Sequence, residues 1–281
     1  MESDHVTERR ARRRLWQIGV DVVDVAGNAG ISQISASVAF FGMFALFPAM
    51  GAVIALFGLF ADPVQVDAQL DLLREVIPQS ALVLLHGQVA ALLAARGDTL
   101  GWATGLSILV ALWSARAGVG ALMTGLTMIM GDPHRSMVHH FIVAIGLTVA
   151  LIGVALVALL AVVVAPLVLA FFPVDAATGW LLEGVRWLVT LGVLLVAAGL
   201  LYRYGPNRRQ RMPLISPGAA VAVLVWLLAS AGLSLYLSNF ANYNQIYGSI
   251  GAVIAMMLWI YVSAYLLLLG AALNMVVLRL R

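Results

Sequence analysis

The stretch FIVAIGLTVALIGVALVALLAVVVAPLVL, residues 141–169, carries no charged side chain and is almost entirely apolar. A helix needs about 20 such residues to cross a hydrocarbon core roughly 30 Å thick. The stretch lacks the period-two alternation that membrane β-barrel strands require. A helix is therefore the structure that can satisfy its backbone polar groups in lipid. This segment predicts a membrane protein built from helices.

The composition of the whole chain supports this prediction. Hydrophobic residues make up 63% of the 281 residues, charged residues 10%, and the mean hydropathy is +1.01. A soluble domain carries roughly 25% charged residues, because its surface must face water. The composition excludes a soluble enzyme and a disordered chain. Cysteine is absent, which excludes a disulfide framework and a cysteine nucleophile.

Five further apolar stretches extend the prediction to an all-α, polytopic bundle of six transmembrane helices with additional amphipathic interfacial helices. If residues 79–95 also crossed the membrane, every later loop would change side, and the arginines of the chain would no longer gather on one side of the membrane. We therefore interpret segment 63–96 as an external amphipathic segment, which either lies on or dips into the membrane. The predicted spans cover residues 34–60, 99–115, 141–169, 180–202, 216–237 and 250–277.

The arginines gather on one side of these spans. They precede the first span and follow the second, fourth and sixth, and only Arg74, Arg96 and Arg186 fall on the other side. Cytoplasmic loops carry the excess of basic residues. We therefore expect the cytoplasmic membrane as the location, with residues 1–33 and 278–281 in the cytoplasm.

Residues 15–28 have the pattern of an amphipathic helix. One interpretation is an interfacial helix that rests on anionic lipid. The other is a short solvated helix whose preceding arginines only set the topology. The apolar stripe consists of Leu15, Ile18, Val22 and Val25, and the opposite polar face of Gln17, Asp21, Asp24 and Asn28.

Several short motifs stand at the ends of the predicted spans. They are SASVAFF (35–41) followed by Phe47-Pro48, LYRYGPNRR (201–209) followed by Pro217-Gly218, and YNQIYGSIGAV (243–253) followed by WIY (259–261) and GAALN (270–274). In this order, over residues 30–277, the motifs resemble the YihY/BrkB family of membrane proteins. The family often has glutamate where this chain has Ala272, so no role of that carboxylate carries over.

The resemblance implies a six-helix bacterial inner-membrane protein without a well-defined biochemical activity. Members of the family are linked to serum resistance in a pathogen and to movement of lipids or lipid precursors across the envelope. The family has also carried a ribonuclease label.

A ribonuclease needs an acid–base pair or a metal-binding carboxylate cluster. The nearest local group of such residues is Asp132, His134, His139 and His140. Adjacent histidines on a helix point in different directions, so ordinary interfacial histidines are the favoured interpretation. We expect no catalytic residue, no metal site and no cofactor, and we reject the nuclease label.

For the charged residues near the spans, a structural role is favoured over a functional one. Glu183 and Arg186, three residues apart, can form a salt bridge on one helix face or a polar station at a pathway entrance. Arg116, just after Trp113, marks the expected inner end of the second span, where we expect it to snorkel to the interface.

Small and polar residues share one stripe of the sixth span. They let helices approach closely and bond across the contact, so we expect this stripe to face inward for packing or, less favoured, to line a pathway. Leu258, Leu268 and Val276 lie off the stripe. Its members are Gly248, Ala252, Ala255, Trp259, Ser263, Gly270 and Asn274, and Ser35, Gly42, Ala45 and Ala49 form a similar face in the first span.

Residues 238–249 are polar without one charge, which predicts an external loop. Such a loop can cap helix ends or bind polar headgroups by neutral hydrogen bonds, and the structural role is favoured. Its polar members include Asn239, Asn242, Tyr243, Asn244 and Tyr247.

Two functions remain open from these patterns. The first is transport or flipping of an amphipathic envelope lipid, and the second is a non-transporting membrane scaffold. A membrane-embedded enzyme ranks third. We expect membrane lipids as partners and no nucleic acid, and the sequence leaves homo-oligomer formation open.

Overall fold

The computed structural model describes residues 16–60, 98–133, 135–159, 176–207, 212–239 and 241–280. All regular structure within these ranges is helical, which confirms the all-α prediction. An N-terminal helix (residues 16–28) precedes six long helices. These are α2 (Ile31–Phe60), α5 (Asp98–Met130), α6 (Met137–Leu159), α8 (Ala176–Tyr204), α9 (Pro217–Asn239) and α10 (Ala241–Arg279).

Each of the six long helices contains a stretch long and apolar enough to cross a membrane. The chain is therefore a polytopic helical membrane protein, as the sequence predicts. The stretches are Ile31–Ala49, Gly105–Met130, Met137–Ala158, Trp180–Tyr204, Pro217–Tyr236 and Val253–Arg279. The predicted external segment 63–96 and the later part of the predicted third span lie outside the described residues.

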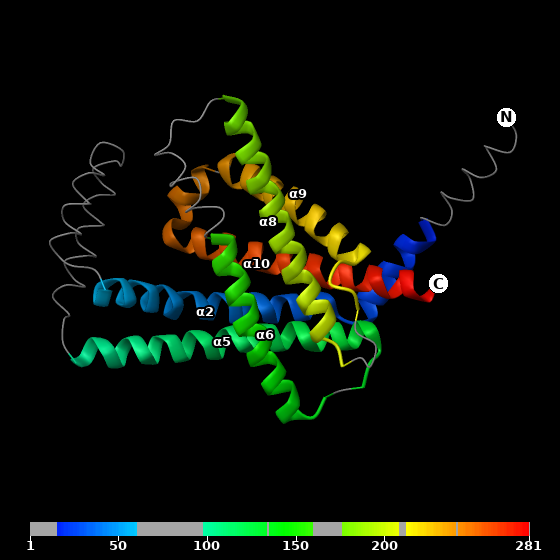
Figure 1. The fold of residues 1–281 in the computed structure, drawn as a ribbon, viewed down its shortest axis with the longest axis horizontal. Coiled ribbons are helices and arrows are strands. Elements are labelled where there is room, and N and C mark those ends of the chain that lie inside the picture. Colours follow the sequence, from blue (N-terminus) through cyan, green and yellow to red (C-terminus); the bar gives the residue numbers. More distant parts are fainter. Residues whose placement is uncertain are drawn as a thin grey trace, which may run out of the picture. The chain divides into compact units, whose positions relative to one another are not determined.

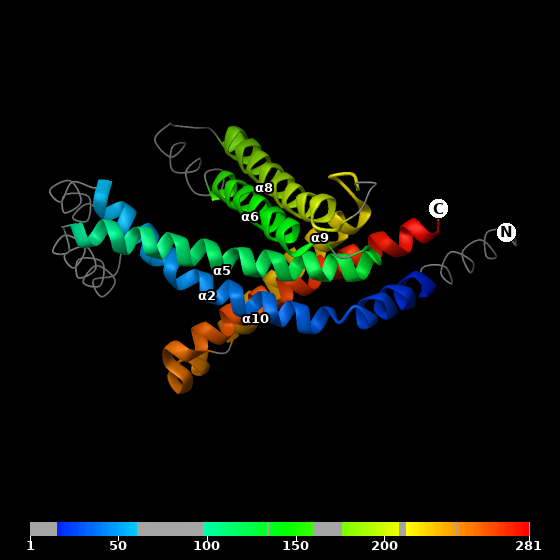
Figure 2. The ribbon, with the colours of Figure 1, turned by 90° about the horizontal axis from the view of Figure 1, so that it is seen from below.

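The chain divides into two compact units, Gly42–Ala115 and the remainder. In the smaller unit, α2 continues through Pro48, and the large side chains Phe44 and Phe47 are exposed. In the larger unit, α9 packs against both α8 and α10, and α8 also packs against α6 (Figures 1 and 2). All the contacts described below lie within the larger unit.

Two glycines in left-handed conformation end helices in the larger unit. Gly30, with φ of 63°, separates the N-terminal helix from α2, and Gly131, with φ of 66°, follows α5. Residues with side chains rarely adopt this conformation, which is why glycine so often follows a helix end.

The core of the larger unit gathers around the second half of α10. Leu268, Ala271 and Ala272 are fully buried, and Val22 and Ala26 of the N-terminal helix belong to the same cluster. The described members of the stripe that we expected to face lipid or water, Ile18, Val22 and Val25, therefore pack against protein. A sequence stripe shows which residues are apolar but not which apolar surface they meet.

Leu268 and Val276 also correct an expectation. Both lie off the predicted inward stripe of the sixth span, yet their side chains are 0% and 2% exposed. Leu268 packs beside Gly125 of α5. The second half of α10 is surrounded by other helices, so it buries bulky positions as well as small ones.

Candidate functional site

Two helices, α9 and α10, approach closely at a contact that we call the glycine contact (Ser216, Gly218, Gly270 and Asn274). A Cβ atom on Gly218 would collide with the carbonyl oxygen of Gly270, and the reverse also holds. The two backbones therefore touch with no side chain between them. Only glycine allows this distance in a membrane bundle.

Polar bonds join the two helices at the same place. The Gly218 N–H donates to Asn274 Oδ1 at 2.7 Å, and Asn274 Nδ2 donates to Ser216 Oγ at 2.9 Å. Ser216 Oγ also accepts the Ala219 N–H at 3.2 Å, as an N-cap residue does. Because Ser216 and Asn274 are buried, these bonds replace water at the start of α9.

Tyr202 brings α8 to this contact. Its hydroxyl donates to the carbonyl oxygen of Leu267 at 2.6 Å and lies directly beside Gly270. The side chain is 1% exposed. Three helices thus meet at Gly270, and Gly270 and Asn274 both face another span.

A second contact between α9 and α10, the tryptophan contact (Trp226, Ser230, Trp259 and Ser263), uses large side chains. The two indole rings lie 5.8 Å apart between centroids. Trp226 Nε1 donates to Ser263 Oγ at 2.8 Å, and Trp259 Nε1 donates to Ser230 Oγ at 3.4 Å. Trp259 remains 39% exposed.

Arg135 caps the end of α8 from the connection between α5 and α6. Its Nη1 donates to the Gly205 carbonyl at 3.0 Å, and its Nη2 to the carbonyls of Tyr204 at 3.0 Å and Pro206 at 2.9 Å. The last carbonyls of a helix carry partial negative charge, which a guanidinium stabilises. Burial lowers the pKa of Arg135, although arginine stays protonated in proteins.

Asn207 forms two further hydrogen bonds with the connection between α5 and α6. It accepts a bond from Arg135 Nε at 3.3 Å and donates to the Pro133 carbonyl at 3.1 Å. From sequence alone Arg135 is a topology charge. The signal that could have pointed further is the YGPN turn at 204–207, because carbonyls at a helix end lack a helical donor. The sequence does not say which arginine supplies that donor.

We expected Arg116 at the inner end of the second span, but it does not lie at the end of the apolar stretch. The helix continues to Met130, so Arg116 lies well inside the apolar stretch Gly105–Met130. At about 1.5 Å per residue it is about 17 Å along the helix from Gly105 and about 21 Å from Met130. Its guanidinium carbon lies 4.7 Å from the centroid of the Phe141 ring in α6, a cation–π contact.

The family follows from a comparison with known proteins. The chain matches the family model "Virulence factor BrkB" over residues 22–281. The chain belongs to the BrkB family. This confirms the resemblance noted from the sequence motifs.

Individual relatives of this BrkB-family chain are bacterial. It is 33% identical over 220 residues to the "Putative ribonuclease-like protein YfkH" of Bacillus subtilis, which covers 76% of this chain and 79% of that protein. It is 30% identical over 100 residues to a UPF0761 membrane protein of Pseudoalteromonas translucida, covering 36% of this chain and 32% of that protein. No solved structure matches the chain.

The remaining candidates of the BrkB-family chain are dispersed. Ser35 is buried and donates to the Ile31 carbonyl at 2.7 Å, whereas Trp113 is 62% exposed. Gly42 and Arg186 are half-buried. The side chain of Glu183 lies outside the described residues, so its pairing with Arg186 stays a prediction.

The expectation of a loop at 238–249 is wrong for the backbone conformation. α9 ends at Asn239 and α10 begins at Ala241, so helix replaces the loop. Uncharged amides are tolerated in a helix when tertiary context favours it. The side chains of Asn239, Asn242, Tyr243, Asn244, Tyr247 and Gly248 are outside the described part, so their roles stay predictions.

The histidine group is only partly described. His139 is exposed, and His140 lies beside Gly120 of α5. Within the described ranges no three His, Cys, Asp or Glu side chains are grouped to hold a metal ion. His134 is outside these ranges.

Proposed function

We propose that this BrkB-family protein moves an amphipathic envelope lipid, or a lipid precursor, between the leaflets of the cytoplasmic membrane. The observation that carries the proposal is the position of Arg116 within the apolar stretch of α5. Charged side chains within membrane-spanning helices are rare and often mark substrate or ion pathways. A phosphate headgroup is the kind of anion that guanidinium binds well.

The surface of α6 supports an amphipathic rather than a purely polar substrate. Phe141 of this helix holds the Arg116 guanidinium. The next turns expose a continuous apolar face at helical spacing, formed by Ile142, Ile145, Val149, Ile152 and Leu156. Acyl chains can follow this face while a headgroup passes the guanidinium.

Reconstituted vesicles test the proposal directly. The full chain should increase exchange of a fluorescently labelled phospholipid between leaflets, measured by bleaching with an impermeant reductant. Arg116→Gln should slow this exchange by about tenfold or more, since one charge-assisted contact is worth about 1.5–3 kcal/mol. Arg203→Gln, in the last turn of α8, is the matched control, because its guanidinium also contacts an aromatic ring, that of Tyr204, and it should retain the wild-type rate. A wild-type rate equal to that of protein-free vesicles would refute lipid movement.

The glycine contact favours a second function, a non-transporting scaffold. Three helices are held there by close backbone approach and buried bonds, as a rigid support requires. Vesicles distinguish the two functions, because a scaffold would leave the exchange rate at the background value for wild type and Arg116→Gln alike.

The orientation of the termini is part of the same proposal. We expect both termini in the cytoplasm, on the positive-inside rule. Because the chain has no cysteine, single cysteines report sidedness to an impermeant thiol reagent. Asn242→Cys should react in intact cells, and Ser136→Cys only after permeabilisation. External labelling at Ser136 would overturn the six-span orientation.

We also infer that the protein is not a ribonuclease, although one relative carries a ribonuclease-like name. Detergent-purified protein should degrade RNA no faster than a mock preparation, with or without divalent metal. Activity that co-purifies over several columns and disappears in His139→Ala/His140→Ala would contradict this.

A further inference from the structure

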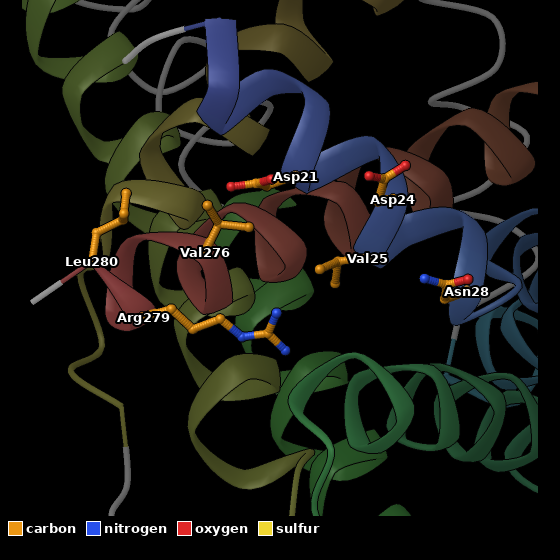
Figure 3. Close-up of a pocket in the computed structure, with 7 residues that line it drawn as sticks. All are labelled: Asp21, Asp24, Val25, Asn28, Val276, Arg279 and Leu280. Atoms are coloured by element: carbon orange, nitrogen blue, oxygen red, sulfur yellow. The ribbon is translucent and has the colours of Figure 1, made fainter.

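A cavity of about 320 Å³ lies between the N-terminal helix and the last turn of α10 (Figure 3). Its polar wall consists of Asp21, Asp24 and Asn28 from the N-terminal helix and Arg279 from α10, with Val25 and Val276 among the apolar lining. The cavity therefore lies between the helix that precedes the first span and the end of the last span.

The charges in the cavity are separated by sign. Asp21 and Asp24, three residues apart, share one face of the N-terminal helix, where two like charges repel each other. Arg279 comes from the other helix. Figure 3 shows the two carboxylates on one side of Val276 and the guanidinium on the other. A ligand complementary to both walls carries a positive group at one end and a negative group at the other.

The N-terminal helix has a third face that is neither polar nor packed against the core. Trp16, Val20 and Val23 follow one another at spacings of four and three, and their side chains are 76%, 44% and 66% exposed. Tryptophan is enriched at the headgroup level of a membrane, and Trp16 stands at the start of the N-terminal helix. This exposed apolar face lies beside the polar face that lines the cavity, as the helical spacing requires.

We propose that the cavity binds the headgroup of a membrane lipid that carries both a primary ammonium and a phosphate, as phosphatidylethanolamine does. The ammonium donates hydrogen bonds to the carboxylates of Asp21 and Asp24, and the guanidinium of Arg279 donates to the phosphate oxygens. The acyl chains lie against the exposed face of the N-terminal helix. This binding does not require lipid movement and uses residues other than Arg116.

Lipid preference of the wild-type chain is the first test. The detergent-purified full chain is titrated with phosphatidylethanolamine, phosphatidylglycerol and phosphatidylcholine of identical acyl chains, and bound lipid is counted by native mass spectrometry. We expect about three- to tenfold tighter binding of phosphatidylethanolamine, because exposed charge-assisted bonds are partly screened. Trimethylammonium has no N–H to donate, so phosphatidylcholine should bind more weakly. Equal binding of all three lipids overturns the proposal.

Substitutions locate the preference in the cavity. Asp21→Asn/Asp24→Asn keeps the shape and should reduce phosphatidylethanolamine binding to the phosphatidylglycerol level, whereas Asp24→Glu should retain the preference. Arg279→Gln should weaken binding of all phosphate lipids. Gln33→Ala, an exposed position of α2 outside the cavity lining, is the control and should match wild type. An unchanged preference in Asp21→Asn/Asp24→Asn, or the same loss in Gln33→Ala, refutes the site.

Soluble phosphoethanolamine separates a lipid from a free metabolite as the source of this headgroup. It should compete only at concentrations at least tenfold above those of the lipid, because it lacks the chains that contact Trp16, Val20 and Val23. Competition at equal concentration would overturn the assignment to a lipid. Vesicle exchange rates need not change in these variants, so failure here is distinguishable from failure of the lipid-movement proposal.

Discussion

The glycine contact and the tryptophan contact join the same two helices, α9 and α10, in opposite ways. At the first, backbone meets backbone at Gly218 and Gly270, and Asn274 is only 3% exposed. At the second, two indole rings 5.8 Å apart fill the space between the helices. Trp259 there is still 39% exposed.

The difference follows from what holds helices together in a membrane. Lipid tails are as apolar as leucine, so burying an apolar side chain against another helix gains little over leaving it in lipid. Close backbone packing and satisfied polar groups contribute instead. We therefore expect the small, buried glycine contact to stabilise the bundle more than the larger, half-exposed tryptophan contact.

Replacing Gly270 should have the largest effect. In Gly270→Leu the new side chain would collide with the Gly218 carbonyl and the Tyr202 hydroxyl, which cannot both withdraw. We expect a loss of about 3 kcal/mol or more, seen as aggregation in size-exclusion chromatography. Gly232→Leu is the control, because Gly232 lies in the partner helix α9 and has open space where a Cβ atom would point. Equal yields of the two variants would show that close backbone packing at Gly270 does not stabilise the bundle.

Asn274→Ala should rank second. It leaves the Gly218 N–H without its buried acceptor and removes one of the two donors to Ser216 Oγ, at a cost of about 1–3 kcal/mol. Thermal unfolding in detergent measures this as a lowered melting temperature. Ser216→Ala shares the same network, so the double variant should lose less than the sum of the two. Strict additivity would show that Asn274 and Ser216 act independently.

Tyr202→Phe should have a smaller effect. The ring still fills its buried site, and only the bond to the Leu267 carbonyl is lost. One neutral hydrogen bond contributes about 0.5–1.5 kcal/mol. The melting temperature should fall between those of wild type and Asn274→Ala. A fall larger than that of Asn274→Ala would place α8, not α9, as the main partner of α10.

Ser263→Ala should be the mildest change. It removes the acceptor of the Trp226 Nε1 bond at a half-exposed position, where such bonds average about 0.6 kcal/mol in membrane proteins. The same thermal assay should detect a small shift. A shift equal to that of Asn274→Ala would mean that the tryptophan contact matters as much as the glycine contact.

The sequence predicted the six spans to within a few residues at most ends, because length and hydrophobicity are properties of each segment alone. It failed where a helix continues past its most apolar part. Arg116 and the serine, threonines and glycines of residues 114–127 hid the continuation of α5 to Met130, and the amides of 239–245 suggested a loop. In both places the helix satisfies its own backbone, so polar side chains do not end it.

For the candidate sites, the small-residue stripe identified Gly270 and Asn274 as positions for helix packing. Nothing in the pattern indicated that Arg135 reaches the end of α8, or that Asp21 and Arg279 line one cavity, because those residues are far apart along the chain. The depth of Arg116 also depended on where α5 ends.

The sequence by itself determined the fold class, the approximate spans and the family, because these depend on local composition and on short motifs. The tertiary structure alone decided which apolar faces meet protein and which stay exposed. The reason is physical: in lipid, apolar patterning does not distinguish a buried face from a lipid-facing one, as Leu268 and Val22 show. Close backbone approach and side-chain bonds between distant residues make that distinction, and both require the folded arrangement.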